Sequence, residues 1–190
     1  MVKCFGGGWL MLRLFYPGAY ADNVFAIDFQ KLYDKGYRGI LFDVDNTLVH
    51  HGEDSTPEVD ELFCKLHKMG FKTVLVSDNG KSRLQRFIAN IDTPYIDNAD
   101  KPQTKSYYKA LELLGVAKEQ AVCIGDQVFT DILGANRSGI DSILVHFIQV
   151  KQNEKIGIRR HIEKIILFFY RRSRYCDRLG DVLKSGENNG

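Results

Sequence analysis

The chain has little of what small secreted and membrane-spanning proteins depend on. It holds four widely separated cysteines, Cys4, Cys64, Cys123 and Cys176. They form no CxxC pair and no zinc-type cluster with histidine, which disfavours a disulfide framework and a structural zinc site. No apolar run reaches the roughly 20 residues that span a bilayer. Arg13 interrupts the apolar start, and no clean small-residue cleavage site follows it. We therefore expect a cytoplasmic protein.

The chain also lacks a strong excess of either charge, since its formal net charge is +2 in 190 residues. A hydrophobic content of 44% and a charged content of 26% are those of an ordinary globular domain. The charge is unevenly placed. Residues 1–150 hold 16 Lys/Arg against 19 Asp/Glu, whereas residues 151–178 hold nine against three. This basic segment predicts an interacting C-terminal part, but it does not by itself indicate a nucleic-acid partner.

Apolar runs of strand length alternate with helical patterns through most of the chain. We expect strands at 38–43, 73–77, 95–96, 121–125 and 141–146, and helices at 28–35, 56–69, 81–90, 104–114 and 130–137. This alternation predicts an α/β fold: a three-layer, Rossmann-like arrangement with a mostly parallel sheet. We divide the chain into an N-terminal extension (1–22), a core (23–150), a basic amphipathic helical segment (151–178) and a disordered tail (179–190).

Two carboxylates follow the first long apolar run, in Ile40-Leu41-Phe42-Asp43-Val44-Asp45-Asn46-Thr47. Open α/β sheets bind ligands beyond the carboxyl ends of their strands, where Asp43 and Asp45 would lie. Two anions this close are costly unless a cation or a shared proton compensates them. The position therefore predicts a site, most simply one that holds Mg²⁺.

Three later segments match that opening. Ser77-Asp78-Asn79 follows the second strand, Lys101-Pro102 precedes a helix, and Gly125-Asp126-Gln127-Val128-Phe129-Thr130-Asp131 follows another strand. An acidic pair, a small hydroxyl, a lysine and a second acidic pair in this order resemble the haloacid dehalogenase superfamily of phosphatases. The resemblance covers about residues 38–146.

This resemblance implies a role for each of the matching residues. Asp43 would be the nucleophile that forms an aspartyl-phosphate, and Asp45 the general acid and base. Lys101 would neutralise charge, and the phosphate would be bound by Ser77, Asp78, Asn79 and Lys101. Mg²⁺ would be held by Asp43, Asp126 and the backbone carbonyl of Asp45, with Thr47 and Asp131 in support.

The spacing between the motifs leaves no room for the cap domain that many members of this superfamily carry. About 29 residues separate Thr47 from Ser77, and one helix takes up half of them. An open site suits a phosphate on something large or membrane-bound. Together with Met11-Leu12-Arg13-Leu14-Phe15-Tyr16-Pro17, the motifs most resemble the capless, YqeG-type branch of subfamily IIIA. This branch is linked to phosphatidylglycerophosphate, a phosphorylated lipid head group.

The basic C-terminal segment favours one of two arrangements. Apolar residues recur at helical spacing at Ile158, Ile162, Ile165, Ile166 and Phe169, among many arginines and lysines. Such a helix can lie on an anionic membrane surface, which would make the protein peripheral to the membrane. Alternatively, its apolar face packs on the sheet and its basic face is merely solvated.

Three other functions remain open at this stage. The chain could act by the same mechanism on a protein or a small phosphorylated metabolite. It could be a phosphoacceptor signalling domain, although such domains have no acid two residues after the acceptor. It could also be a non-catalytic interaction protein that kept the fold. The sequence gives no indication of an oligomeric state.

Overall fold

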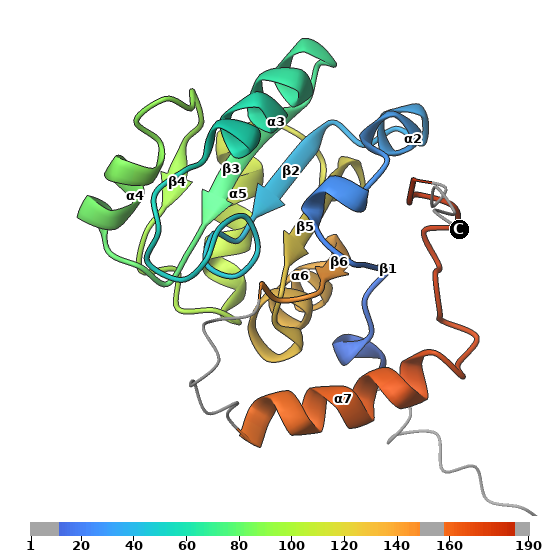
Figure 1. Ribbon diagram of the computed structural model, residues 1–190. Coiled ribbons are helices and arrows are strands. Elements are labelled where there is room, and N and C mark those ends of the chain that lie inside the picture. Colours follow the sequence, from blue (N-terminus) through green and yellow to red (C-terminus); the bar gives the residue numbers. More distant parts are fainter. Residues whose placement is uncertain (1–11, 149–157, 185–190) are drawn as a thin grey trace, which may run out of the picture.

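The computed structural model describes residues 12–148 and 158–184, and its centre is a six-stranded parallel sheet (Figure 1). The strands lie in the order β1-β6-β5-β2-β3-β4, and every neighbouring pair is parallel. Their bounds are β1 Ala19–Ala21, β2 Gly39–Phe42, β3 Lys72–Val76, β4 Tyr95–Ile96, β5 Ala121–Gly125 and β6 Asp141–Val145. The chain runs outward from β2 to β4 and then returns to β5 on the other side of β2. This reversal makes a topological switch point beside β2, where α/β sheets bind their ligands.

Helices cover both faces of the sheet. One face packs against α2 (Phe29–Asp34), α3 (Pro57–Lys68) and α4 (Lys81–Phe87), and the other against α5 (Thr104–Leu114) and α6 (Leu133–Ser138). A single turn of π-helix, η4 (Val128–Ile132), leads from β5 into α6. The last helix, α7 (Ile158–Tyr170), runs along the β1–β6 side of the molecule (Figure 1). The described residues also include three short 3-10 turns: η1 Arg13–Phe15, η2 Val24–Ala26 and η3 Lys118–Gln120.

Local sequence explains where the longer helices begin and end. At the start of α3, the Thr56 hydroxyl accepts a hydrogen bond from the Val59 amide, and Pro57 occupies the first turn. The hydroxyl satisfies one of the free amides of the helix N-terminus, and proline has no amide N–H that would need a partner. At the end of α5, Gly115 adopts a left-handed conformation with φ of 59°, which glycine reaches at little steric cost.

The three-layer parallel fold predicted from the sequence is confirmed, with most element boundaries within a few residues. No cap is inserted in residues 43–120, because only α3 lies between β2 and β3 and only α4 between β3 and β4.

The predicted N-terminal extension, residues 1–22, is wrong in its second half. Residues 19–21 form β1, the edge strand that pairs with β6, and Tyr16 is buried. Residues 19–21 are too few and too mixed in character to show a strand pattern of their own. Their strand conformation depends on pairing with β6, over 100 residues later. Residues 1–11 lie outside the described residues.

The predicted disordered tail, residues 179–190, is also wrong where the structure describes it. Leu179 and Val182 are buried in the main core, and Leu183 forms a bridge with Ile27. The backbone carbonyl of Val182 accepts a hydrogen bond from the Asp28 amide at 2.9 Å. The C-terminal end therefore packs beside α2. The part predicted to be disordered on composition, residues 185–190, lies outside the described residues.

This packing predicts that the tail contributes to stability. We expect Val182→Ala to lower the free energy of unfolding by about 2 kcal/mol, because two buried methyl groups are lost and a cavity remains. Asp181→Ala is the matched control. The Asp181 side chain is 80% exposed and pairs with Lys31 at the surface, so we expect it to cost less than about 1 kcal/mol. Equal losses in urea titrations would contradict this account.

Candidate active site

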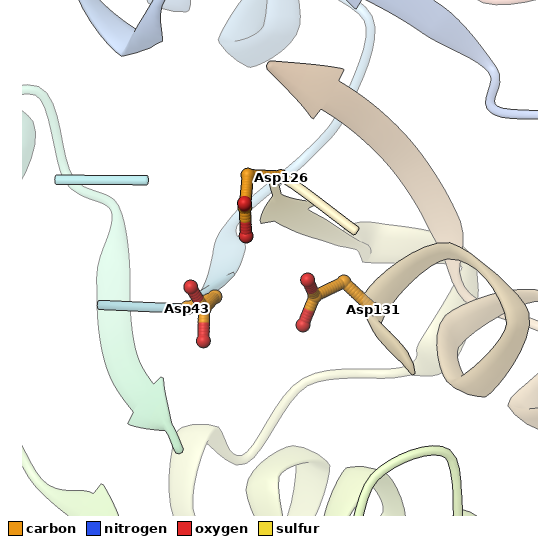
Figure 2. Close-up of side chains that lie close together, drawn as sticks. All are labelled: Asp43, Asp126 and Asp131. Atoms are coloured by element: carbon orange, nitrogen blue, oxygen red, sulfur yellow. The ribbon is translucent and has the colours of Figure 1, made fainter. Parts of the chain in front are cut away.

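Three aspartates from the two central strands and the turn after them converge at the carboxyl edge of the sheet. Asp43 follows β2, Asp126 follows β5, and Asp131 comes from η4 (Figure 2). All three are buried, and each has a carboxylate oxygen within 4.8 Å of those of the others. Parallel pairing places Phe42 opposite Ile124, so the two motifs end at the same level. The structure thus brings together residues that are over 80 positions apart.

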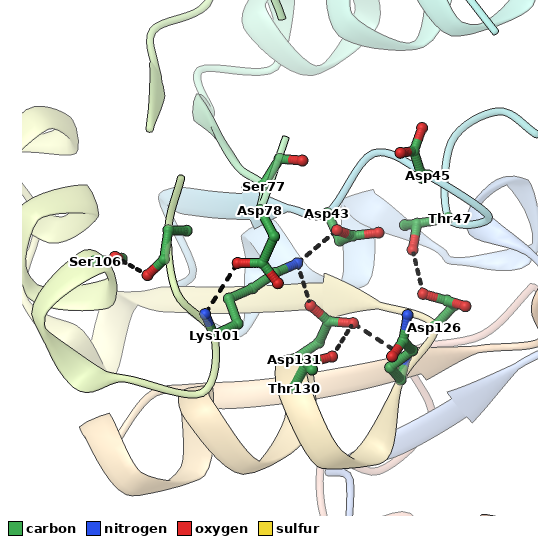
Figure 3. A network of polar contacts seen from close by, with 12 residues as sticks. Asp43, Asp45, Thr47, Ser77, Asp78, Lys101, Ser106, Asp126, Thr130 and Asp131 are labelled. Carbon is green, nitrogen blue, oxygen red and sulfur yellow. Dashed lines mark hydrogen bonds and ion pairs between the residues drawn. The ribbon is translucent and has the colours of Figure 1, made fainter. Parts of the chain in front are cut away.

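Lys101 lies between two of these carboxylates. Its Nζ donates to Asp43 Oδ1 at 2.6 Å and to Asp131 Oδ1 at 2.7 Å (Figure 3). Its backbone amide donates to the Asp78 carboxylate at 3.0 Å, and the Lys101-Pro102 peptide bond is cis. Burial alone would lower the pKa of Lys101, but the carboxylates of Asp131 and Asp43 raise it well above its ordinary range. The lysine is therefore a fixed positive charge.

The acidic cluster carries more negative charge than Lys101 offsets. Burial, together with repulsion from neighbouring carboxylates, raises the pKa of both Asp43 and Asp126. Asp43 Oδ2 is buried and has no hydrogen-bond partner among the residues that the structure describes. A buried anionic oxygen without a partner is costly. Three carboxylates with such an oxygen fit a divalent cation that prefers oxygen ligands.

Close backbone approach explains the glycine in the second acidic motif. A side chain at Gly125 would place its Cβ 2.7 Å from Asp131 Oδ2. The same Asp131 oxygen accepts a hydrogen bond from the Gln127 amide at 3.1 Å. Glycine at 125 therefore lets the turn fold back, so that Asp131 reaches Lys101.

Asp45 lies apart from this cluster and has a different environment. Its carboxylate accepts hydrogen bonds from Asn79 Nδ2 at 2.7 Å and from the Gly52 amide at 3.1 Å. Arg83 Nη2 lies at 3.2 Å and His51 Nδ1 at 3.1 Å. Burial tends to raise the pKa of Asp45, but these donors together lower it below its ordinary value. The pKa values of Asp43 and Asp45, which are two residues apart, are thus shifted in opposite directions.

Asn79, one of the predicted phosphate-binding residues, makes local contacts in the segment after β3. Its backbone amide donates to Ser77 Oγ at 3.2 Å, as does its Nδ2 at 2.9 Å. Because Ser77 Oγ accepts two hydrogen bonds, its own proton is directed elsewhere. Asn79 therefore positions Asp45 and Ser77, and its backbone amide is already engaged.

A pocket of about 200 Å³ connects these groups. Its lining residues include Asp43, Asp45, Ser77, Asp78, Asn79 and Lys101. Thr47 lies behind it, with its Oγ1 3.5 Å from Asp126 Oδ1. Pockets for whole small-molecule ligands usually enclose about 300–1,000 Å³. A smaller pocket suits the reacting group of a ligand whose remainder lies outside.

Four residues that are not among the predicted site residues also contact the site. His51 and Arg83 approach Asp45, as described above. From α7, Arg160 pairs with the Asp126 carboxylate and donates to its backbone carbonyl at 2.6 Å. Glu163 accepts a hydrogen bond from the Val128 amide at 2.9 Å. The sequence offered one signal for Arg160 and Glu163. They are one helical turn apart, and Glu163 is the single acid of α7, so they could form the ion pair that the structure shows.

Comparison with known proteins agrees with this geometry. The family profile of the haloacid dehalogenase-like hydrolases matches residues 52–139. The probable phosphatase YqeG of Bacillus subtilis is 34% identical over 159 residues, which are 83% of this chain and 92% of that protein. A glyceraldehyde 3-phosphate phosphatase of Pyrococcus furiosus is 25% identical over 96 residues, which are 46% of this chain and 40% of that protein.

Solved structures support the fold. NagD from E. coli K-12 superposes with a TM-score of 0.50 at 12% identity, covering 64% of this chain and 94% of that one. At this identity the likeness concerns the fold alone. The relationship to YqeG covers most of both chains. The chain therefore belongs to the YqeG-type phosphatases of the haloacid dehalogenase-like hydrolases.

Proposed function

We propose that the protein is a Mg²⁺-dependent phosphomonoester hydrolase that acts through an aspartyl-phosphate on Asp43. The observation that carries this proposal is the Asp43 carboxylate. Lys101 holds its Oδ1 at 2.6 Å, whereas its Oδ2 is buried without a partner among the described residues. One oxygen is thus fixed in place, and the carboxylate keeps the capacity to attack. A carboxylate nucleophile splits one difficult displacement into two easier ones.

In the first step, an Asp43 oxygen attacks phosphorus, and the bond from phosphorus to the leaving oxygen breaks. Ser77 Oγ and Lys101 Nζ balance charge on the phosphoryl oxygens, which is the main task in phosphoryl transfer. Asp43 and Asp126, with the backbone carbonyl of Asp45, would hold Mg²⁺, which supplies further positive charge when bound. Asp131 keeps Lys101 aligned at 2.7 Å.

Asp45 transfers the protons. It protonates the leaving oxygen and then accepts a proton from the water that attacks the aspartyl-phosphate. Asn79, Gly52, His51 and Arg83 favour the ionised form of Asp45, which suits the second step directly. An approaching phosphate dianion would oppose that ionised form by repulsion and so favour the protonated acid required in the first step.

The expected effect of Asp43→Asn is the loss of both turnover and the covalent intermediate. An amide is a poor nucleophile, so we expect kcat to fall by about a thousandfold or more. Acid-quenched wild-type enzyme should carry a phosphoryl group on the peptide that contains residue 43, as detected by mass spectrometry. Asp92→Asn, an exposed acid outside the site, is the control. A variant at position 43 with normal turnover would refute the nucleophile.

The raised pKa values predict a pH effect on the metal-free protein. Between the ordinary carboxyl value of 3.8 and about 8 for Asp126, the folded state holds more protons than the unfolded state. The free energy of unfolding should therefore fall as the pH rises through this range. Mg²⁺ should reduce the fall, because it replaces the proton at the carboxylates. Denaturant titrations in EDTA and in Mg²⁺ test this, and superimposable pH profiles would contradict it.

For the substrate, we propose a phosphate carried on a membrane lipid, such as the phosphatidylglycerophosphate head group. The small pocket and the lack of an inserted cap in residues 43–120 support this class. The outer surface of α7 supports it further. Ile158, Ile162, Ile165 and Phe169 form one exposed stripe, with Phe168 beside it. Of the five apolar residues identified in the sequence, only Ile166 is buried.

Charge on α7 matches an anionic surface. The exposed residues around the apolar stripe include Arg159, Lys164, Arg171 and Arg172, whereas Glu163, the only acid of α7, is buried. Each basic residue close to an anionic membrane contributes about 1 kcal/mol, and apolar side chains add contact that salt does not screen. Among the helices in the described parts of the chain, none combines the length and apolar character that crossing a bilayer requires. The expected contact is therefore along the surface.

The alternative substrate is a small phosphorylated metabolite, which the name of the Pyrococcus furiosus relative suggests. We expect kcat/KM to be higher for phosphatidylglycerophosphate in anionic vesicles than for glyceraldehyde 3-phosphate. The double variant Ile165→Ser and Phe169→Ser should lose vesicle co-sedimentation and lipid hydrolysis, yet keep hydrolysis of p-nitrophenyl phosphate. The control is Tyr108→Ser with Leu113→Ser, which have similar exposure on α5. Equal vesicle binding by both double variants would refute the membrane contact.

A further inference from the structure

The inner face of α7, unlike its exposed outer face, contacts the core and the active site. Arg160, Glu163, Ile166 and Tyr170 follow one another at helical spacing and point toward the core. Ile166 and Tyr170 pack with Val128, Ile132 and Leu144, which anchors the second half of the helix. Arg160 and Glu163 form polar contacts with the turn that carries Asp126. The first half of α7 is therefore attached to the active site itself.

The contact between Arg160 and Asp126 uses two groups of each partner. Nη2 pairs with Asp126 Oδ2, and Nη1 donates to the Asp126 backbone carbonyl at 2.6 Å. Nη1 also lies 3.0 Å from Glu163 Oε2, which holds the guanidinium in place. The other oxygen, Asp126 Oδ1, is 3.5 Å from the Thr47 hydroxyl. A cation that takes Asp126 as a ligand must share or displace these partners.

We infer that Arg160 is a positioning residue that competes with the metal ion for the Asp126 carboxylate, so that the seating of α7 sets the metal affinity of the site. The inference rests on the proposed function, because it takes Asp126 to be a metal ligand. Two positive groups that require the same carboxylate oxygen weaken each other's binding, and this effect is reciprocal. Metal binding should therefore loosen the first turns of α7, and removal of the guanidinium should strengthen metal binding.

The test is direct binding of Mg²⁺ or Mn²⁺ to the full chain, measured by isothermal titration calorimetry. We expect Arg160→Met to bind the metal more tightly, within the about 5- to 150-fold range of typical coupling between two ligands. Arg159→Met is the matched control, because Arg159 is the neighbouring, exposed arginine of α7. Its affinity should equal that of the wild type. Unchanged or weaker binding by Arg160→Met would overturn the inference.

Two further measurements keep the test decisive. If Arg160→Met does not fold, Arg160→Lys replaces it. Lysine keeps the charge but lacks the planar group that reaches carboxylate and carbonyl together, so its metal affinity should lie above that of the wild type. An unchanged affinity would again overturn the inference. In the wild type, hydrogen exchange of residues 158–163 should become faster when Mg²⁺ is added, and slower or unchanged exchange would contradict the competition.

Asp126→Asn separates this inference from the proposed function. If this variant binds Mg²⁺ as the wild type does, Asp126 is not a ligand, and both the proposed metal site and the inference fall. If it loses Mg²⁺ binding while Arg160→Met gains no affinity, the metal site stands and only the role of Arg160 is refuted.

Discussion

Three buried carboxylates lie within 4.8 Å of one another at the end of the sheet, and their mutual repulsion must be offset for the site to exist. Two positively charged side chains approach them, Lys101 from the turn before α5 and Arg160 from α7. Both are held at more than one point, since removing a charge from water is worthwhile only with well-placed partners. The glycine at 125, the turn at η4 and the seating of α7 all serve to place these charges.

The same constraint explains how two aspartates separated by one residue can differ in chemistry. Asp43 faces the crowded side of the site, where burial and neighbouring carboxylates raise its pKa. Asp45 faces Asn79, Gly52 and Arg83, whose donors lower its pKa. Groups whose environments push their pKa values apart are suited to different tasks in one reaction. In the proposed mechanism, the attacking group and the proton carrier would therefore point in different directions from one short turn.

The sequence was sufficient for the core and for the aspartates because their signals are local. A strand such as 121–125 is a continuous apolar run, and the carboxyl ends of parallel strands meet at one edge. The parts that the sequence did not predict depend on distant contacts. Residues 19–21 form a strand by pairing with β6, and Val182 lies in the main core beside residues 26–28, more than 150 positions away. Arg160 could not be assigned to the site for the same reason, since its partner Asp126 is 34 positions away.

The sequence left two arrangements open for the C-terminal helix, and the structure combines elements of both. Its inner residues, Ile166 and Tyr170, pack on the core, while four of the five apolar residues first noted remain exposed. A helix that only covered the sheet would bury its apolar stripe, because exposed apolar patches are uncommon unless a partner covers them. A helix that only bound a surface would not place Arg160 on Asp126. Because α7 carries an apolar stripe on its outer face and an ion pair with Asp126 on its inner face, a partner that moves the helix would also act on Asp126.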